Sequence, residues 1–253
     1  WANCVAGTLR KDELIEIIQK AGFTEVECTR LTHYTTAETT QGATFKAQKI
    51  SASTCRERHW ENIFQTKDYT QVLWHQNTPY FSLNLIEKYA DKEDTIIDVG
   101  CGASYLADKL LENGYTDITL LDASQCSLNI VKERLKDGYV PKFIHTDILE
   151  FKTEKSYKIW HDRAVFHFLL NQKEQKAYFE VLKRSLVKDG IAIISTFSTR
   201  GETQCAGLDI VQYDYKKMSD LLPQDFKIIE CDQFIHITPK DTQQQYIYFV
   251  LTL

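Results

Sequence analysis

The sequence predicts an α/β protein: a mostly parallel sheet with helices on both faces, finished by antiparallel strands at one edge. From Ser82 onward, strand-like apolar runs alternate with segments of helical periodicity, which is the pattern of parallel strands joined by crossover helices. The run 191–197, IAIISTF, is apolar on both faces, as expected for a strand covered on both sides. The last strand-like segments, 226–234 and 246–252, have the spacing of a hairpin.

The N-terminal residues are predicted to form a small helix-strand appendage. Residues 8–22 place apolar side chains at i, i+3, i+4 and i+7 from Leu14, with Thr8 as N-cap and Gly22 just past the helix end. A strand of alternating polarity follows directly. The next segment, 32–54, is rich in Thr, Gln, Ala and Ser, and is predicted as a weak strand and linker.

A new composition begins at Arg56. We therefore predict an appendage over residues 1–55 and a main domain over residues 56–253. The 253 residues are enough for one α/β domain of about 200 residues plus such an appendage. The main domain opens with RERHWENIFQTKDYTQVLWHQNTP, in which aromatic and polar residues are interleaved.

The alternating region gives its elements in a regular order. We expect a helix at 82–89, a strand at 95–99, a helix at 104–113, a strand at 118–121, a helix capped by Ser124, strands within 142–147 and 157–162, and a helix from Asn171 to about 187. Asn171 and Glu174 have the spacing of a capping box. Gly190 is predicted to end the last of these helices.

Composition favours a small molecule or a protein as partner. The net charge is −5 and lysines are spread along the chain, so no surface for nucleic acid or an anionic membrane is expected. No apolar run approaches the roughly 20 residues that span a bilayer. The seven cysteines lie far apart and form no CxxC pair, so no disulfide framework or metal site is expected, and a cytoplasmic location fits best. The chain begins at Trp1 and its one methionine is Met218, so we expect a fragment or a processed form.

Acidic residues and glycines follow the predicted strands, where an open α/β sheet binds its ligands. Gly100 and Gly102 follow the first strand, and glycine lets a loop turn sharply and lets a ligand lie on bare backbone. Carboxylates at neighbouring strand ends can accept hydrogen bonds from hydroxyl and amino groups. An acid follows each of four successive strands: Asp98, Asp122, Asp147 and Asp162.

The glycine loop departs from a dinucleotide-binding loop in two ways. Tyr105 stands where the third glycine is needed, and Asp98 would repel a diphosphate. The loop suits a ligand with a cationic amino-acid end and a ribose, such as S-adenosylmethionine. A purely structural turn is the alternative, and the acids at the neighbouring strand ends argue against it.

Three segments together carry a resemblance to a known family. They are DTIIDVGCGASYLADKLLENGYTDITLLDAS, HTDIL and IWHDRAVFHFL. The chain from Trp60 to Leu253 resembles class I S-adenosylmethionine-dependent methyltransferases, which implies a Rossmann-like, seven-stranded sheet. The resemblance further implies binding of S-adenosylmethionine, with S-adenosylhomocysteine as product. Its expected contacts are Trp60, Tyr69, Asp98, Gly100, Cys101, Gly102, Asp122, Ala123, Asp147, Ile148 and His161.

The resemblance also suggests catalytic residues. His161 and Asp162 would lie beside the transferred methyl group, and His161 or His167 could accept a proton from the acceptor, because histidine titrates near neutral pH. No base is obligatory, since positioning can carry much of a methyl transfer. The apolar context VFHFL favours a core residue at His167, and Cys101 is interpreted as a small packing residue rather than a nucleophile.

The aromatic opening of the main domain has two interpretations. Trp60 and Tyr69 could form a lid on the sulfonium, because an aromatic face attracts a cation. They could also belong to an amphipathic helix seated on the sheet. Trp74 and His75 stay open, and the segments 205–208 and 236–239 are weaker candidates for the acceptor pocket.

A second resemblance lies at the N-terminus. The opening WANCVAGTLRKDELIEIIQKAGFTEVE resembles the C-terminal tail of arsenite methyltransferases. Only Cys4 matches an arsenic-binding position, and trivalent arsenic needs several thiolates. The alternative is that residues 1–50 are a packing unit without such a role.

The sequence supports several functions. A methyltransferase for a small-molecule acceptor comes first. A protein lysine methyltransferase is the alternative, since the aromatic opening also resembles that of some lysine methyltransferases; an open, acidic acceptor groove would favour it. A non-catalytic partner and a metalloid-related enzyme complete the set.

Overall fold

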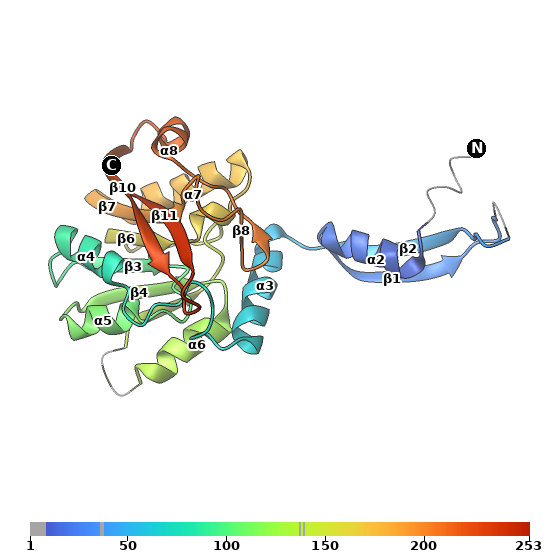
Figure 1. Cartoon of the computed structure of the whole chain (residues 1–253), viewed down its shortest axis with the longest axis horizontal. Helices are drawn as coiled ribbons and strands as arrows, with labels where there is room; N and C mark the ends of the chain where they lie inside the picture. The colour runs from blue at the N-terminus through green and yellow to red at the C-terminus, as the bar shows by residue number, and fades with distance from the viewer. Residues whose placement is uncertain (1–8, 36–37, 137, 139) are drawn as a thin grey trace. The chain divides into compact units, whose positions relative to one another are not determined.

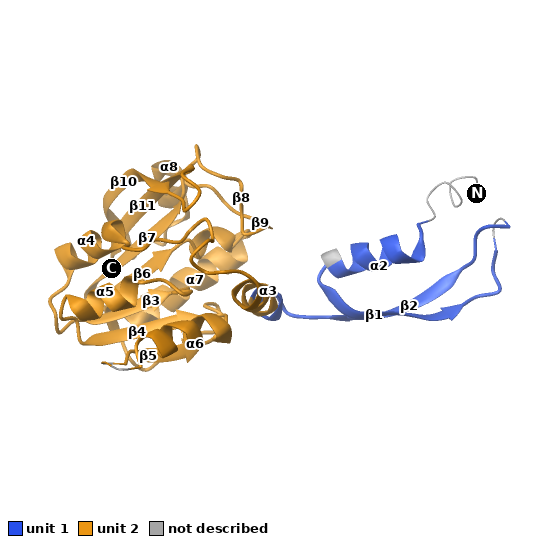
Figure 2. Cartoon of the chain, turned by 60° about the horizontal axis from the view of Figure 1, so that its bottom comes forward, with its two compact units in different colours: residues 1–56 blue, residues 57–253 orange. Residues whose placement is uncertain are grey.

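The computed structural model describes residues 9–35, 38–136, 138 and 140–253 (Figure 1). The chain divides into two compact units, residues 1–56 and residues 57–253 (Figure 2). The predicted functional domains, 1–55 and 56–253, stay a prediction. Within the described ranges, no helix has both the length and the apolar character needed to cross a membrane.

The N-terminal unit is a helix followed by a two-stranded antiparallel sheet. Helix α2 covers Lys11–Lys20, and strands β1 and β2 cover Phe23–Leu31 and Ala43–Lys49. Gly22 ends the helix in the left-handed region, as predicted, with φ +84°. None of the described residues up to Ser51 is buried, so this unit has no buried core of its own there. The predicted cap Thr8 and the arsenic candidate Cys4 lie outside the described residues.

The second unit is built on a seven-stranded sheet of order β10-β11-β7-β6-β3-β4-β5. The five strands from β7 to β5 in this order are parallel, and β11 runs antiparallel to both β7 and β10. This arrangement confirms the predicted fold class. The strands are β3 Thr95–Val99, β4 Asp117–Asp122, β5 Lys142–His145, β6 Tyr157–Arg163, β7 Leu186–Phe197, β10 Lys227–Ile237 and β11 Gln243–Thr252.

Helices cover both faces of this sheet, because the central strands bury side chains on both sides. Ile96 and Ile97 are neighbours on β3 yet belong to different hydrophobic clusters, one on each face. One cluster includes α4, α5 and α6, which are Tyr80–Tyr89, Leu106–Glu112 and Gln125–Arg134. The other includes α7 and α8, which are Gln172–Ser185 and Tyr215–Leu221.

The strand order reverses between β3 and β6. The chain passes from β3 outward to β4 and β5, then returns to β6 on the other side of β3 and continues to β7. In register, Asp98 lies opposite His161 and Val99 opposite Asp162. The carboxyl ends of β3 and β6 therefore flank the position where open α/β sheets bind ligands.

Local signals placed most helix ends correctly. Ser124 accepts a hydrogen bond from the Ser127 N–H, and Asn171 accepts one from the Glu174 N–H, as capping predicts. The predicted role of Gly190 was wrong. Helix α7 ends at Ser185, and Gly190 lies inside β7, where an added Cβ would come within 3.2 Å of the Tyr157 carbonyl.

Candidate active site

The glycine loop after β3 is held tightly against the end of β4. The backbone N–H groups of Gly100 and Cys101 both donate to the Leu121 carbonyl, at 2.7 and 3.1 Å. Gly100 and Gly102 have φ of +63° and +53°, which favours glycine. Cys101 is buried, and burial raises the pKa of its thiol, so it packs between the glycines as a neutral group.

Asp122, the last residue of β4, is a buried carboxylate that ties this loop to the next helix. Its Oδ2 accepts a hydrogen bond from the Gly102 N–H and its Oδ1 one from the Ser124 N–H, both at 2.7 Å. Burial raises the pKa of Asp122 to about 6, although these N–H groups act in the opposite direction. Asp122 is therefore charged at neutral pH and loses its charge under mildly acidic conditions.

The ends of β4 and β5 bring the other predicted nucleoside contacts together. Asp147 is buried shortly after β5, and its Oδ1 accepts a hydrogen bond from the Leu149 N–H at 2.9 Å. Ile148 is buried beside it. The Ala123 carbonyl lies 3.0 Å from Nε2 of His145, the last residue of β5. This end of the site therefore presents the carboxylates of Asp122 and Asp147 together with the apolar side chain of Ile148.

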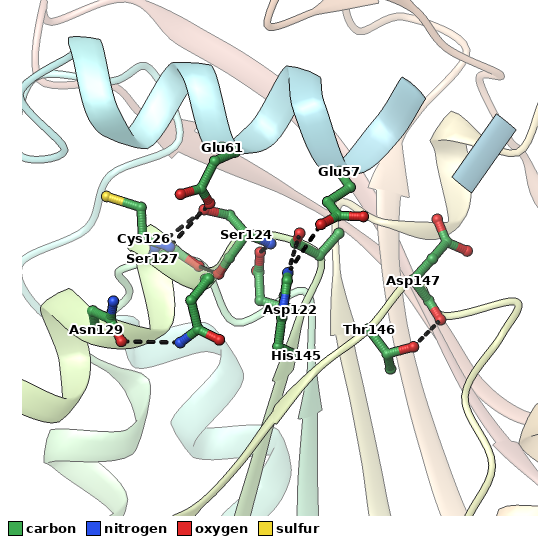
Figure 3. Close-up of polar contacts among 12 residues, drawn as sticks. Glu57, Glu61, Asp122, Ser124, Cys126, Ser127, Asn129, His145, Thr146 and Asp147 are labelled. Atoms are coloured by element: carbon green, nitrogen blue, oxygen red, sulfur yellow. Dashed lines mark hydrogen bonds and ion pairs between the residues drawn. The ribbon is translucent and has the colours of Figure 1, made fainter. Parts of the chain in front are cut away.

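Helix α3, Ala52–Thr66, lies across these strand ends (Figure 3). Glu61 Oε2 accepts hydrogen bonds from Ser124 Oγ at 2.7 Å and from the Cys126 N–H at 3.0 Å. Burial raises the pKa of Glu61, but the bonds from Cys126 and Ser124 outweigh it and hold that pKa below its usual value. One turn earlier, the carboxylate of Glu57 lies 3.7 Å from His145 Nε2. Two glutamates thus face the nucleoside end from above.

His161 joins β3 and β6 below the loop. Its Nδ1 lies 2.7 Å from Asp98 Oδ1, and its Nε2 lies 2.9 Å from Ser82 Oγ on α4. All three residues are buried. Because both ring nitrogens are engaged, this geometry favours a role for His161 in holding Asp98 in place. The hydrogen bond to His161 engages only one carboxylate oxygen of Asp98, Oδ1.

Asp162 organises the turn that follows β6. Its Oδ1 accepts hydrogen bonds from the Val165 and Phe166 N–H groups, at 2.9 and 3.4 Å, and its Oδ2 one from the Tyr178 hydroxyl at 2.6 Å. It is fully buried, and burial raises its pKa to about 6. These contacts favour a structural role in the turn over contact with a transferred group.

His167 is a neutral core residue in this structure. Its ring stacks on Phe197 with centroids 5.2 Å apart, and it is fully buried. Burial lowers its pKa to about 3. This environment supports the core interpretation over the proton acceptor, because a base should titrate near the working pH.

The aromatic residues of the opening segment form two separate sets of ring contacts. Trp60 packs edge-on against Trp74 and Phe168, with centroids 5.9 and 5.2 Å apart. Tyr69 neighbours His75, which in turn neighbours Tyr105 beyond the glycine loop. Trp60 lies on helix α3, in agreement with the helix interpretation, and its role as a lid on the sulfonium stays a prediction.

A cleft of about 850 Å³ opens next to this loop. It lies between residues 70–80 and the tip of the β10–β11 hairpin. His236 lines it and donates from Nε2 to the Leu73 carbonyl at 2.7 Å. The residues that line the cleft include no Asp, Glu, Lys or Arg: they are Thr70, Gln71, His75, Gln76, Asn77, Thr78, Tyr80, Ile235, His236, Ile237, Thr238 and Pro239.

The residues at the reversal of strand order fit a ligand with an ammonium group at one end and a nucleoside at the other. Asp98 is a buried carboxylate just before the tight turn at Gly100 and Gly102, where a cation would offset its charge. Asp122 and Asp147 supply acceptors at the neighbouring strand ends. The profile of the methyltransferase domain family matches residues 90–246. The chain belongs to this family.

Curated relatives of this methyltransferase act on different acceptors. This chain is 26% identical over 177 residues to malonyl-[acyl-carrier protein] O-methyltransferase 1 of Ilyobacter polytropus, and the match covers 66% of this chain and 64% of that protein. It is 27% identical over 127 residues to the Bos taurus eEF1A lysine and N-terminal methyltransferase, covering 49% of this chain and 18% of that protein. The chain thus spans less than two thirds of both proteins.

Solved structures share the fold of this methyltransferase. An S-adenosylmethionine-dependent methyltransferase of Anabaena variabilis matches with a TM-score of 0.63 at 16% identity, covering 81% of this chain and 96% of that one. Burkholderia thailandensis 1,6-didemethyltoxoflavin-N1-methyltransferase, solved with its acceptor and S-adenosylhomocysteine, matches with a TM-score of 0.58 at 15% identity, covering 86% and 97%. These likenesses show the fold, and the family match confirms the predicted methyltransferase class. The likeness of the N-terminus to arsenite methyltransferases stays a prediction.

Several residues of the site were not singled out from the sequence. Glu61 and Ser82 contact partners more than 60 positions away, and no local pattern marks them. Arg163 did have a signal, since it directly follows Asp162 at a strand end. Tyr178 is helical, and only the folded chain brings its hydroxyl to Asp162.

Proposed function

We propose that this methyltransferase transfers a methyl group from S-adenosylmethionine to a small-molecule acceptor. The observation that carries the proposal is the convergence of a tight glycine loop with three buried carboxylates at the reversal of strand order. Asp98 lies at the proposed amino-acid end, and Asp122 and Asp147 lie at the proposed nucleoside end. No other described part of the chain combines these groups.

Each residue has a proposed role at the cofactor. Asp98, held by His161, would pair with the ammonium group, and the backbone of Gly100 and Gly102 would line the methionine portion. Asp122 would accept hydrogen bonds from the ribose hydroxyls. Asp147 and the backbone of Ile148 would bind the adenine amino group, while Ala123 would pack against the ring.

Catalysis would rest on positioning and on exclusion of water. When bound, S-adenosylmethionine supplies an activated methyl group, and its displacement needs the acceptor atom in line with the breaking bond. Helix α3, Trp60 and the loop around Trp74 cover the site and would keep water out. Both ring nitrogens of His161 are engaged, and burial lowers the pKa of His167 to about 3, so we propose no histidine base.

The cleft favours a small molecule over a protein lysine side chain. A groove for a basic peptide is expected to carry acidic residues, and no Asp or Glu is among the residues that line this cleft. Its volume of about 850 Å³ lies in the range of small-molecule sites.

Calorimetric titration with S-adenosylhomocysteine tests the proposal directly. The chain should bind the product in a one-to-one complex. The same preparation should transfer radiolabelled methyl groups from S-adenosylmethionine to a component of a low-molecular-weight metabolite extract. Absence of S-adenosylhomocysteine binding would reject the proposed function, and labelling confined to protein fractions would reject the small-molecule acceptor.

Glu61 is expected to control how long the cofactor product stays bound. Glu61→Gln removes the charge that holds α3 to Ser124 and Cys126, so S-adenosylhomocysteine should dissociate roughly three- to tenfold faster. Glu57→Gln is the matched control, because its exposed ion pair with His145 is long and should contribute little. Stopped-flow displacement measures both rates. Equal effects of the two substitutions would show that the Glu61 contacts do not hold the helix.

A further inference from the structure

Arg163 places a positive charge beside the reversal of strand order. It is the last residue of β6 and is partly buried. Its Nη1 donates to the Trp74 carbonyl at 3.1 Å. In the described part of the chain, no carboxylate forms an ion pair with it. A guanidinium in this position has most of its five N–H donors left for another partner.

The turn that presents Arg163 is built to hold one conformation. Asp162, just before it, fixes the Val165 and Phe166 N–H groups. Ala164, just after it, has φ +72°, which is uncommon outside glycine, and its N–H donates to the Ser195 carbonyl at 2.9 Å. Strained backbone of this kind is concentrated at binding sites, where the surrounding contacts maintain it.

The neighbours of Arg163 are aromatic or carry polar atoms without a protein partner. Tyr246 is 1% exposed, and its hydroxyl has no hydrogen-bond partner within the described residues. Burial raises the pKa of Tyr246 and of the Cys205 thiol, and the charge of Arg163 opposes both shifts, which places it close to both groups. Phe197 packs on Tyr246 with centroids 4.5 Å apart.

The charge near Arg163 is not balanced by Glu202. That residue lies close enough to act on the pKa of Cys205 and Tyr246, but it is exposed and forms no ion pair with Arg163. A partly buried guanidinium without an acid is costly unless a ligand supplies the opposite charge. Arginine binds a carboxylate with two parallel hydrogen bonds, which also fixes the orientation of the ligand.

We propose that Arg163 recognises the carboxylate of an aromatic acid, which is the methyl acceptor and whose ring lies at the aromatic side of this turn, near Trp74 and Tyr246. The proposal rests on the proposed function and names the substrate class of the same site. The Tyr246 hydroxyl is the second polar contact available to such a ligand.

Binding of matched aromatic probes tests this assignment. The probes are 4-hydroxybenzoate, 2-aminobenzoate and indole-3-carboxylate, each paired with its neutral carboxamide, titrated by calorimetry with S-adenosylhomocysteine saturating. At least one carboxylate should bind the unchanged chain more tightly than its carboxamide. Arg163→Gln should weaken that carboxylate roughly tenfold to a hundredfold, since a charge-assisted hydrogen bond is lost, and should change the carboxamide little. The affinity of Arg163→Lys for that carboxylate should lie between the affinities of the unchanged chain and of Arg163→Gln.

Two controls separate recognition from loop support. Arg200→Gln removes an exposed arginine after β7 and should leave every affinity unchanged. Arg163→Gln should keep the affinity for S-adenosylhomocysteine. Equal weakening of carboxylate and carboxamide would overturn the proposal, because Arg163 would then act only by holding the Trp74 loop. Binding of S-adenosylhomocysteine without binding of any carboxylate would overturn the substrate class alone, whereas loss of both would reject the proposed function as well.

Discussion

Gly100→Ala should destabilise the methyltransferase unit by about 2 to 5 kcal/mol, which combines the cost of a left-handed alanine with the cost of overpacking. The added Cβ would overlap Cγ2 of Val165. Valine is stiff about χ1, so the turn after β6 would have to move. We therefore also expect cofactor binding to be lost. Denaturant unfolding and calorimetry with S-adenosylhomocysteine measure the two effects.

Gly114→Ala is the matched control for this substitution. Gly114 has φ +88°, but an added Cβ there meets no atom within 4 Å. Its alanine variant should carry only the backbone cost of about 1 to 2 kcal/mol. Adding Val165→Ala to Gly100→Ala removes the overlap and should bring the double variant near that level. If Gly100→Ala costs no more than Gly114→Ala, the contact with Val165 does not confine the loop.

Asp122→Asn should raise the dissociation constant for S-adenosylhomocysteine by roughly ten- to a hundredfold, because hydrogen bonds to a charged group are worth about 1.5 to 3 kcal/mol. The amide also cannot accept hydrogen bonds from both Gly102 and Ser124 as the carboxylate does. Asp117→Asn is the control, since Asp117 begins the same strand at its opposite end and pairs with Lys155. It should bind S-adenosylhomocysteine as the unchanged chain does.

The pH dependence of binding gives a second readout for Asp122. Its pKa is raised to about 6, so the carboxylate proposed to accept the ribose hydrogen bonds is charged above pH 6 and protonated below it. The affinity of the unchanged chain for S-adenosylhomocysteine should therefore fall as the pH is lowered from 7.5 to 5.5. Asp122→Asn has no such proton to gain, so its weak affinity should stay flat over this range. A parallel fall in both proteins would assign the pH effect to another group.

The fold was predictable because its strands and caps carry local signals. The run 95–99 was placed at its observed ends, and Ser124 and Asn171 begin their helices through hydrogen bonds within one turn. The prediction for Gly190 was wrong because glycine occurs both at helix ends and at points where two backbones approach closely. Only the position of Tyr157 on the neighbouring strand distinguishes them.

The candidate site was predictable only in part. Asp98, Asp122 and Asp147 lie at strand ends, so their convergence follows from a parallel sheet alone. The roles of His161, Asp162 and His167 depend on which face of the sheet each side chain meets, and thus on Ser82, Tyr178 and Phe197, which are distant in sequence. These roles, like the cofactor contacts, stay predictions until binding is measured.

The contact between Glu61 and the start of α6 bears on how fast the enzyme can turn over. Ser124 caps α6 and directly follows Ala123. Through Glu61, helix α3, which is proposed to cover the nucleoside, is fastened to the loop that is proposed to bind it. On the proposed function, exchange of spent for fresh cofactor would require this fastening to break in every cycle. The frequency of that opening would then set an upper limit on the rate of exchange.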